Sequence, residues 1–242
     1  MASATGVPAR PPTEARERDP LLGPGRDASD TNAQTVSGNL FSGTAFIAQS
    51  GTFMLTAIIW TSVLTKPFIL FSWHPLAQSA GILLLIQSIL VLQPTHSAEQ
   101  KRVGQTVHAY LNFVSFLVLG GGVGVIEYNK IISNGQHLKS VHGYLGATAA
   151  CVLLLQYFVG FTMWATPVLY GGQANARAMW KYHRFSGYVT LLLLLATVCT
   201  AADTGFVQNV LKVGLWTLAV PCGLIAIGVL PRVHLYKFGF KK

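Results

Sequence analysis

Four histidines stand at the start of four successive apolar segments. They are His74, His108, His142 and His183, at intervals of 34, 34 and 41 residues, each about one membrane span plus a loop. A polar ring at the start of a lipid-embedded helix is costly, so such residues usually have a function. Imidazole is a common ligand of transition metals and of haem iron. The spacing therefore indicates metal or haem chemistry within a membrane protein.

The composition supports a membrane protein. Of the 242 residues, 51% are hydrophobic and only 10% are charged, whereas soluble domains have roughly 25% charged residues. A helix needs about 20 residues to cross about 30 Å of hydrocarbon. Six apolar segments come close to this length, at 42–64, 73–93, 106–126, 141–165, 182–201 and 209–230. We expect an all-α membrane protein with six transmembrane helices.

The histidines also suggest how these helices are arranged. The first and sixth segments have no histidine near their starts, so helices two to five form a central four-helix bundle flanked by two helices. This transmembrane domain covers 37–232, and a short basic tail follows at 233–242. Residues 1–36 are polar, rich in Pro and Arg and without periodicity, and we expect them to be a disordered tail.

One stretch of the N-terminal tail carries a sorting motif. Glu17 precedes the pair Leu21 and Leu22 in Glu-Arg-Asp-Pro-Leu-Leu, which resembles an acidic dileucine signal read on cytosolic tails. A used signal would direct the protein to vacuolar or lysosomal membranes. The alternative is an ordinary solvated tail.

Basic residues set the expected orientation. With six spans, both termini face one side, and that side collects most of the positive charge: four arginines of the tail and Lys101, Arg102, Arg177, Lys181, Arg184, Arg232, Lys237, Lys241 and Lys242. The other side has only Lys66, Lys130, Lys139 and Lys212. An excess of Lys and Arg marks the cytosolic face, so both termini are expected in the cytosol. The formal charge of +9 is then loop charge at a membrane, and no basic stripe interleaved with aromatics indicates nucleic-acid binding.

This topology sorts the histidines into two pairs. Helices two and four start on the non-cytosolic side, which puts His74 and His142 at one level. Helices three and five start on the cytosolic side, which puts His108 and His183 at the other. Two imidazoles from facing helices form a bis-His axial set for a haem iron. Two such sets would place one haem near each face of the membrane.

A polar anchor, a zinc site and a proton relay each explain the histidines less well than a haem site does. A single histidine near an interface commonly acts only as a polar anchor, but four at equivalent helix starts argue against that. A zinc site needs four ligands, and each level offers only two histidines. A proton relay normally includes Asp or Glu within the membrane, and none lies mid-span here. The three cysteines lie in apolar runs without a CxxCH motif, so any haem is expected to be non-covalent.

Residues near the histidines fit a haem. Gly146 follows His142 by four residues, Gly187 follows His183 by four, and Gly81 follows His74 by seven, so each shares a helical face with its histidine. We expect these glycines to leave a flat surface for a porphyrin. Arg184 and Lys181 are candidates for contact with haem propionates near the cytosolic pair, as Lys139 is near the other.

The motifs together resemble those of a known family. Trp73-His74-Pro75, His108-Ala109-Tyr110-Leu111-Asn112, Val141-His142-Gly143 and Tyr182-His183-Arg184-Phe185-Ser186-Gly187 are similar to the four haem-ligand motifs of the cytochrome b561 family. The resemblance covers roughly residues 40–232 and is to the small, stand-alone members without a DOMON domain. It implies six transmembrane helices and two b-type haems. His74 and His142 would ligate the non-cytosolic haem, and His108 and His183 the cytosolic one.

The same resemblance implies an activity. Family members are transmembrane oxidoreductases that pass electrons from cytosolic ascorbate to monodehydroascorbate or ferric chelates on the other side. Ascorbate-using members have basic residues ahead of helices three and five, and Lys101, Arg102 and Arg177 stand at comparable places. A basic residue expected closer to His108 is missing, because Gln105 and Thr106 stand there. On the acceptor side, His137 and Lys139 are candidates by location only.

The missing basic residue leaves alternatives open. One is a dihaem membrane protein with another donor or a regulatory role. Another is a haem-free transporter. The lipid bilayer is an obligatory partner in every case, and a homodimer is a candidate assembly.

Overall fold

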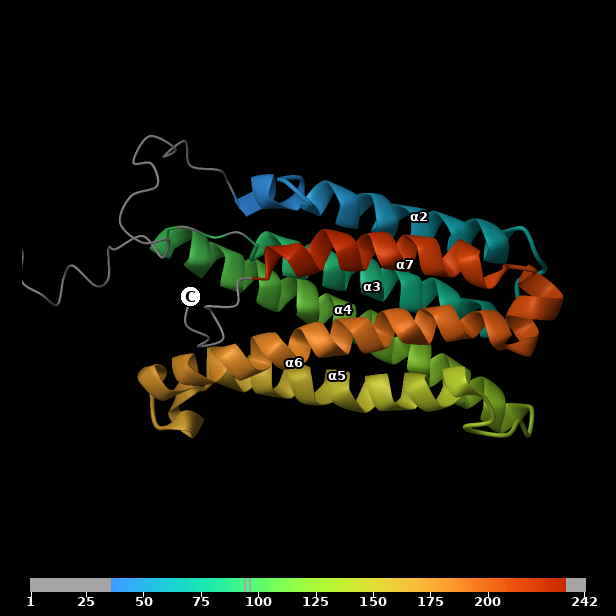
Figure 1. Cartoon of the computed structure of the whole chain (residues 1–242). Coiled ribbons are helices and arrows are strands. Elements are labelled where there is room, and N and C mark those ends of the chain that lie inside the picture. The colour runs from blue at the N-terminus through green and yellow to red at the C-terminus, as the bar shows by residue number, and fades with distance from the viewer. Residues whose placement is uncertain (1–35, 94, 96, 234–242) are drawn as a thin grey trace, which may run out of the picture.

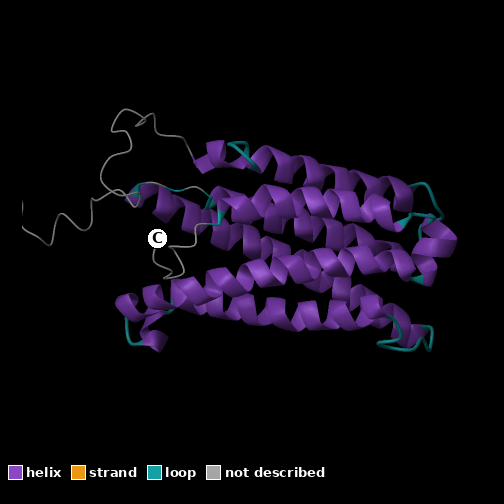
Figure 2. Ribbon diagram, in the orientation of Figure 1, coloured by secondary structure: helices purple, strands orange, loops and turns teal. Residues whose placement is uncertain are grey.

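The computed structural model describes residues 36–93, 95 and 97–233, and this part of the chain is helical with no strand (Figure 2). Residues 1–35, with the dileucine motif at Glu17, Leu21 and Leu22, lie outside the described part, as do His96 and the tail at 234–242. The domain boundaries expected near both termini therefore stay predictions.

Six long helices form the molecule (Figure 1). All six are long and apolar enough to cross a membrane, the last when it is taken together with the 3₁₀ turn that continues it to Arg232. They are α2 (Ala45–Leu64), α3 (Trp73–Val91), α4 (Ala98–Ile132), α5 (Val141–Ala165), α6 (Gln173–Thr200) and α7 (Leu215–Val229). They run alternately up and down, so α2, α4 and α6 begin at the end where α3, α5 and α7 finish (Figure 1). The prediction of an all-α protein with six spans is confirmed.

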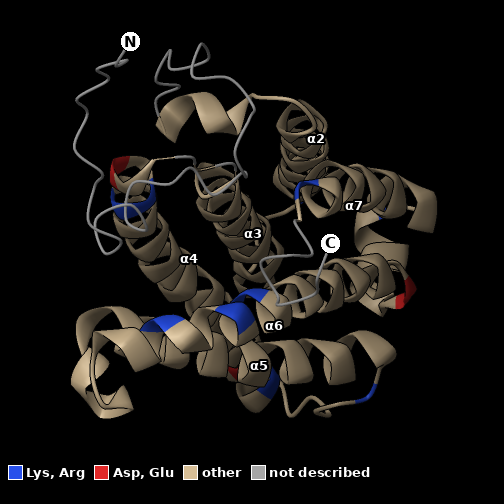
Figure 3. Cartoon of the chain, turned by 60° about the vertical axis from the view of Figure 1, so that its left-hand side comes forward, with Lys and Arg blue, Asp and Glu red and all other residues tan. Residues whose placement is uncertain are grey.

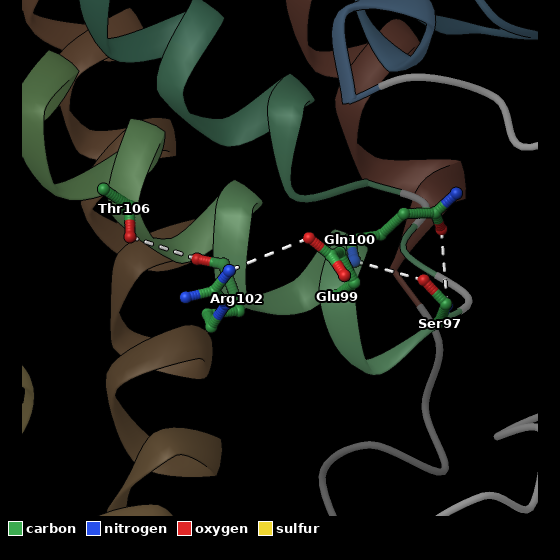
Figure 4. A network of polar contacts seen from close by, with 5 residues as sticks. All are labelled: Ser97, Glu99, Gln100, Arg102 and Thr106. Atoms are coloured by element: carbon green, nitrogen blue, oxygen red, sulfur yellow. Dashed lines mark hydrogen bonds and ion pairs between the residues drawn. The ribbon is translucent and has the colours of Figure 1, made fainter.

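Two helices are longer than hydropathy indicated. The apolar segments begin at residues 106 and 182, whereas α4 begins at Ala98 and α6 at Gln173. At the start of α4, Ser97 Oγ accepts a hydrogen bond from the Gln100 backbone N–H at 3.1 Å, and the Gln100 side chain accepts one from the Ser97 N–H at 3.3 Å (Figure 4). This capping box starts a helix in a polar stretch, which a search for apolar runs overlooks.

The last helix starts later than expected. The sixth apolar segment begins at residue 209, but Val207–Leu211 forms a π-helical turn that ends at Lys212. Lys212 has φ 56°, a left-handed conformation that stops a right-handed helix. Leu215 then begins α7. The prediction of a continuous helix from residue 209 was therefore wrong by six residues.

Close helix packing accounts for Gly51 of α2 and Gly228 of α7. A Cβ added at Gly51 would lie 2.8 Å from Leu224 Cβ, and one at Gly228 would lie 2.6 Å from Ala48 Cα. Small residues allow such approach between membrane helices. Figure 1 shows α2 and α7 side by side, and their contact is among the most extensive in the molecule.

Other helices also pack in pairs. The pairs α3 with α4 and α5 with α6 are each in extensive contact, whereas α4 and α5 touch only sparsely. The core between the helices is aliphatic, with Ile86 and Leu90 of α3, Leu191 of α6 and Ile225 of α7 almost fully buried. The four helices that carry the histidines are thus two tight pairs.

Charged side chains gather at the ends of the bundle. Figure 3 looks onto the end where α4 and α6 begin and α7 finishes, and Lys and Arg are visible on all three. The described basic residues there are Lys101, Arg102, Arg177, Lys181, Arg184 and Arg232. We call this the α4/α6-start end. It carries the excess of positive charge expected of a cytosolic face.

Candidate functional site

His74 and His142 form the first pair. His74 lies in the first turn of α3 and His142 in the first turn of α5, two helices that begin at the same end of the bundle. Their ring centroids are 6.3 Å apart and the ring planes are nearly perpendicular, at 85°. The structure therefore brings together two histidines that are 68 residues apart in the sequence, as the topology predicted.

Both rings of this pair are held by backbone carbonyls. His74 Nδ1 lies 2.9 Å from Gly122 O on α4, and His142 Nδ1 lies 2.8 Å from Thr197 O on α6. A carbonyl oxygen can only accept, so each Nδ1 carries the hydrogen. In a neutral imidazole the other nitrogen, Nε2, then keeps its lone pair. Both rings are therefore in the tautomer that can bind a metal through Nε2.

His108 and His183 are the second predicted pair, and both lie in the halves of α4 and α6 nearer the α4/α6-start end. His108 Nδ1 lies 2.8 Å from Ser88 O on α3. His183 differs from the other three, because its buried Nδ1 has no hydrogen-bond partner among the described residues. Its ring instead lies against Gly160 of α5, where an added Cβ would be 3.0 Å from His183 Cε1.

The two pairs lie at different depths in the bundle. Gly122, whose carbonyl accepts from His74, follows His108 by 14 residues on α4. At about 1.5 Å per residue the separation is about 21 Å along the helix. The hydrocarbon core of a bilayer is about 30 Å thick. One pair therefore stands toward each end of the spanning region.

The glycines fit the expectation only in part. An added Cβ at Gly187 would meet nothing within 4 Å, and one at Gly146 would meet only Thr197 Cγ2 at 3.7 Å. Gly81 is different, because a Cβ there would lie 2.6 Å from Leu119 Cδ2. Gly81 thus allows α3 and α4 to pack closely and does not leave an open surface.

The basic candidates lie at one end of the bundle, on two helix starts. Lys101 and Arg102 are in the first turns of α4, and Arg177 is in the first turns of α6. Arg102 Nη2 is 3.7 Å from Glu99 Oε1 (Figure 4), and the two side chains are 80% and 78% exposed. Such an exposed ion pair contributes little free energy, so the Arg102 charge stays available to an anion. Arg184 adjoins His183 and is half-buried.

One pair at the opposite end was not predicted. His137 Nδ1 lies 2.7 Å from Glu127 Oε2, with both side chains about half exposed, at 47% and 48%. Location alone had made His137 a candidate for the acceptor side. Glu127 lies on α4 and His137 in the loop after it, so no helical spacing indicated the contact.

The sequence did not predict the main hydrogen-bond partners of the histidines, which are backbone carbonyls. Gly122 O, Ser88 O and Thr197 O each accept from a histidine. Every residue carries a carbonyl, so its use as a partner depends on which helices pack together. No signal in the sequence distinguishes these three positions.

Comparison with known proteins identifies several relatives of the chain. The lysosomal membrane ascorbate-dependent ferrireductase CYB561A3 of Rattus norvegicus is 27% identical over 137 residues, which is 56% of this chain and 53% of that protein. The transmembrane reductase CYB561D2 of Bos taurus is 30% identical over 192 residues, 74% of this chain and 84% of that protein. The plasma membrane ascorbate-dependent reductase CYBRD1 of Mus musculus is 31% identical over 136 residues, 53% of this chain and 44% of that protein.

The chain thus spans about half the length of the ferrireductases it matches. The family model for eukaryotic cytochrome b561 matches residues 73–210, a stretch that includes all four helix-start histidines, His74, His108, His142 and His183. That stretch is more than half of the chain, and the protein is therefore a member of the cytochrome b561 family.

Proposed function

We propose that the protein holds two b-type haems, one between His74 and His142 and one between His108 and His183, and transfers electrons across a membrane. The observation that carries the proposal is the 6.3 Å between the His74 and His142 ring centroids. A histidine nitrogen lies about 2 Å from its metal, and the ring centre about 1 Å further. Two imidazoles that both bound one iron would therefore have ring centres about 6 Å apart.

The hydrogen bonds of the rings support the same assignment. Metal-ligating histidines typically donate their other ring N–H to a carbonyl or carboxylate, which fixes the tautomer and the ring orientation. His74, His142 and His108 each have such a carbonyl partner within 2.9 Å. A histidine that served only as a polar anchor at the interface would not need a hydrogen bond that fixes its tautomer and orientation.

The haems, when bound, would supply one-electron redox chemistry at two depths of the membrane. The chain would contribute the imidazoles of the four histidines, the helices that fix their separation, and the apolar surroundings that keep water away. Because the two pairs stand at opposite ends of the spanning region, electrons can cross without transport of a metal or a substrate.

Ascorbate is the proposed donor, at the α4/α6-start end. Two of the relatives reported above are named as ascorbate-dependent. Ascorbate is an anion, and the charges of Lys101, Arg102 and Arg177 would attract it to the end where His108 and His183 lie. Arg184, beside His183 in the sequence, is the proposed partner of a haem propionate. The acceptor on the other side is proposed to be monodehydroascorbate or a ferric chelate.

The excess of Lys and Arg at the α4/α6-start end supports a cytosolic location for that end and for both termini. The lysosomal location in the name of one relative and the dileucine motif of the tail both favour an endomembrane. Leu21→Ala with Leu22→Ala should move the protein from lysosomal or vacuolar membranes to the cell surface. An unchanged distribution would mean that the motif is unused.

Reconstituted vesicles of known orientation test the function. Ascorbate added on the α4/α6-start side should reduce both haems, as seen in the reduced-minus-oxidised spectrum. An impermeant ferric chelate trapped on the other side should then be reduced. Purified folded protein without haem would overturn the proposal, and so would retention of both haems in His74→Ala or His108→Ala, each of which should lose about one.

A second candidate is a dihaem protein with another donor or a regulatory role. Gln105 and Thr106 stand where a basic residue was expected, which favours this alternative. Ascorbate that fails to reduce either haem, while dithionite reduces both, would establish it.

A further inference from the structure

Four hydrogen bonds from side chains to backbone carbonyls join α3 to α4, two antiparallel helices in extensive contact (Figure 1). The donors and their acceptors are His74 with Gly122 O and Gln78 with Leu119 O, both at 2.9 Å, and Ser115 with Gly81 O and His108 with Ser88 O, both at 2.8 Å. All four share one register, because the 14 residues from His74 to Ser88 match the 14 from His108 to Gly122. We call this row the α3/α4 ladder. It ends in histidines of different pairs, so it holds one imidazole at each depth of the bundle.

Gln78 supplies the contact of the ladder next to His74. It follows His74 by four residues and therefore lies one turn further along the same face of α3. Its acceptor, Leu119 O, lies about one turn before Gly122 on α4. The two hydrogen bonds thus hold the same stretch of α4 backbone at neighbouring points. A shift of that stretch would change the distance from Gly122 O to His74 Nδ1.

Gly122 leaves the space that Gln78 occupies. A Cβ added at Gly122 would lie 2.5 Å from Gln78 Nε2 and 3.0 Å from Ala77 Cβ. The nearby glycines Gly121 and Gly124 differ, because a Cβ at either position would meet nothing within 4 Å. The missing side chain at residue 122 therefore allows the Gln78 amide to reach across to α4.

We propose that Gln78, acting through the α4 backbone at Gly122, is a positioning residue for the His74 imidazole. The inference rests on the proposed function, since its consequence falls on the haem proposed between His74 and His142. In a ligating histidine, the hydrogen bond from Nδ1–H to a carbonyl raises the basicity of Nε2 and fixes the ring orientation. By binding Leu119 O, Gln78 keeps Gly122 O at 2.9 Å from His74 Nδ1. It thereby also helps to hold the 85° angle between the His74 and His142 ring planes.

Gln78→Met in the purified dihaem protein tests this role. Methionine has a similar length but no N–H donor, so Leu119 O loses its partner and the hydrogen bond of His74 should lengthen. The haem to follow is the one that is absent in His74→Ala. Its midpoint potential should rise, because a less basic imidazole stabilises the ferric iron less. Its passage to apomyoglobin should be about two- to tenfold faster, as expected for one weakened hydrogen bond.

The EPR spectrum of the ferric protein provides a second measurement. The spectrum of a low-spin haem depends on the angle between its two imidazole planes, so the signal of the same haem should change in Gln78→Met. The haem that is absent in His108→Ala should keep its wild-type potential and signal. These readouts report the orientation of His74 and do not depend on a donor or an acceptor.

Gly122→Ala disturbs the same contact from the other helix. Its methyl group would displace the Gln78 amide, so the same haem should change in the same direction as in Gln78→Met. Gly121→Ala is the matched control, because its methyl group meets nothing within 4 Å, and it should behave like the wild type.

Ser79→Ala separates positioning from stability. Ser79 is the neighbour of Gln78 on α3, and its buried hydroxyl accepts a hydrogen bond from Trp60 Nε1 of α2 at 3.1 Å. This variant should lower the midpoint of thermal unfolding and leave both haems unchanged. If Ser79→Ala shifts the same potential, or if Gln78→Met and Gly122→Ala both match the wild type in potential and EPR signal, the positioning role is overturned. A wild type without a haem bound by His74 would instead contradict the proposed function.

Discussion

Gly160 of α5 lies directly against the ring of His183 on α6. A Cβ added at Gly160 would be 3.0 Å from His183 Cε1 and 3.4 Å from His183 Nε2. The ring has no hydrogen bond at its buried Nδ1 among the described residues. His183 is therefore oriented by packing against a glycine, whereas the other three histidines are oriented by carbonyls.

Gly160→Ala should disturb the His108–His183 haem and spare the other. The added methyl group would lie closer to the ring than an ordinary van der Waals contact, so the ring must shift slightly, and no hydrogen bond from the described residues holds Nδ1 in its original orientation. We expect weaker retention of one haem, measured as haem content after purification and as the reduced-minus-oxidised spectrum. Gly223→Ala on α7, where a Cβ meets nothing within 4 Å, is the matched control. Loss of the His74–His142 haem in Gly160→Ala would contradict this prediction.

The sequence predicted that His74 lies beside His142 but not how each ring is held. Helix starts alternate between the two ends of a six-span bundle, and this alone assigns His74 to His142. The carbonyl of Gly122 and the surface of Gly160 depend on which helix faces which, and that is decided by packing. Apolar patterns also missed the polar first turns of α4, where Ser97 and Gln100 form a capping box.

Gly51→Ala should destabilise the bundle without changing haem content. A Cβ at Gly51 would lie 2.6 Å from Pro221 O and 2.8 Å from Leu224 Cβ, so α2 and α7 would have to move apart. Overpacking of this kind costs about 1–3 kcal/mol. A lower midpoint of thermal unfolding in detergent, relative to Gly223→Ala, would show it. Equal midpoints for the two variants would mean that α2 and α7 move apart without loss of stability.

A pair of glutamines should couple α2 to α3. Gln49 Nε2 donates to Gln87 Oε1 at 2.7 Å, and Gln87 Nε2 donates to Gln49 Oε1 at 2.9 Å. Removing one partner leaves a buried amide unsatisfied, whereas removing both does not. Gln87→Leu alone should therefore cost more stability than the double variant Gln49→Leu, Gln87→Leu. Contacts of this type between membrane helices are worth about 0.6 kcal/mol on average and up to about 2. Strictly additive effects in unfolding measurements would show that the amides do not interact.

Charge reversal at Lys101 and Arg102 should slow reduction by ascorbate. Both residues lie in the first turns of α4, at the end that holds His108 and His183, and Arg102 is exposed despite its ion pair with Glu99. Exposed charges steer an anion, and this steering weakens with salt. Lys101→Glu with Arg102→Glu should therefore lower the rate with ascorbate but leave haem content and reduction by dithionite unchanged. Higher ionic strength should slow the wild type and narrow its advantage over the variant.

The opposite end supplies the control for this experiment. Lys130 and Lys139 lie at the other end of the bundle, where α4 finishes and α5 begins. Lys130→Glu with Lys139→Glu changes the charge by the same amount but away from the proposed donor site. This variant should keep the wild-type rate with ascorbate, and any effect should fall on the acceptor step. If both double variants slow ascorbate equally, net charge and not a local site controls the reaction. If neither does, ascorbate does not enter beside the first turns of α4, and Arg177 on α6 becomes the next residue to reverse.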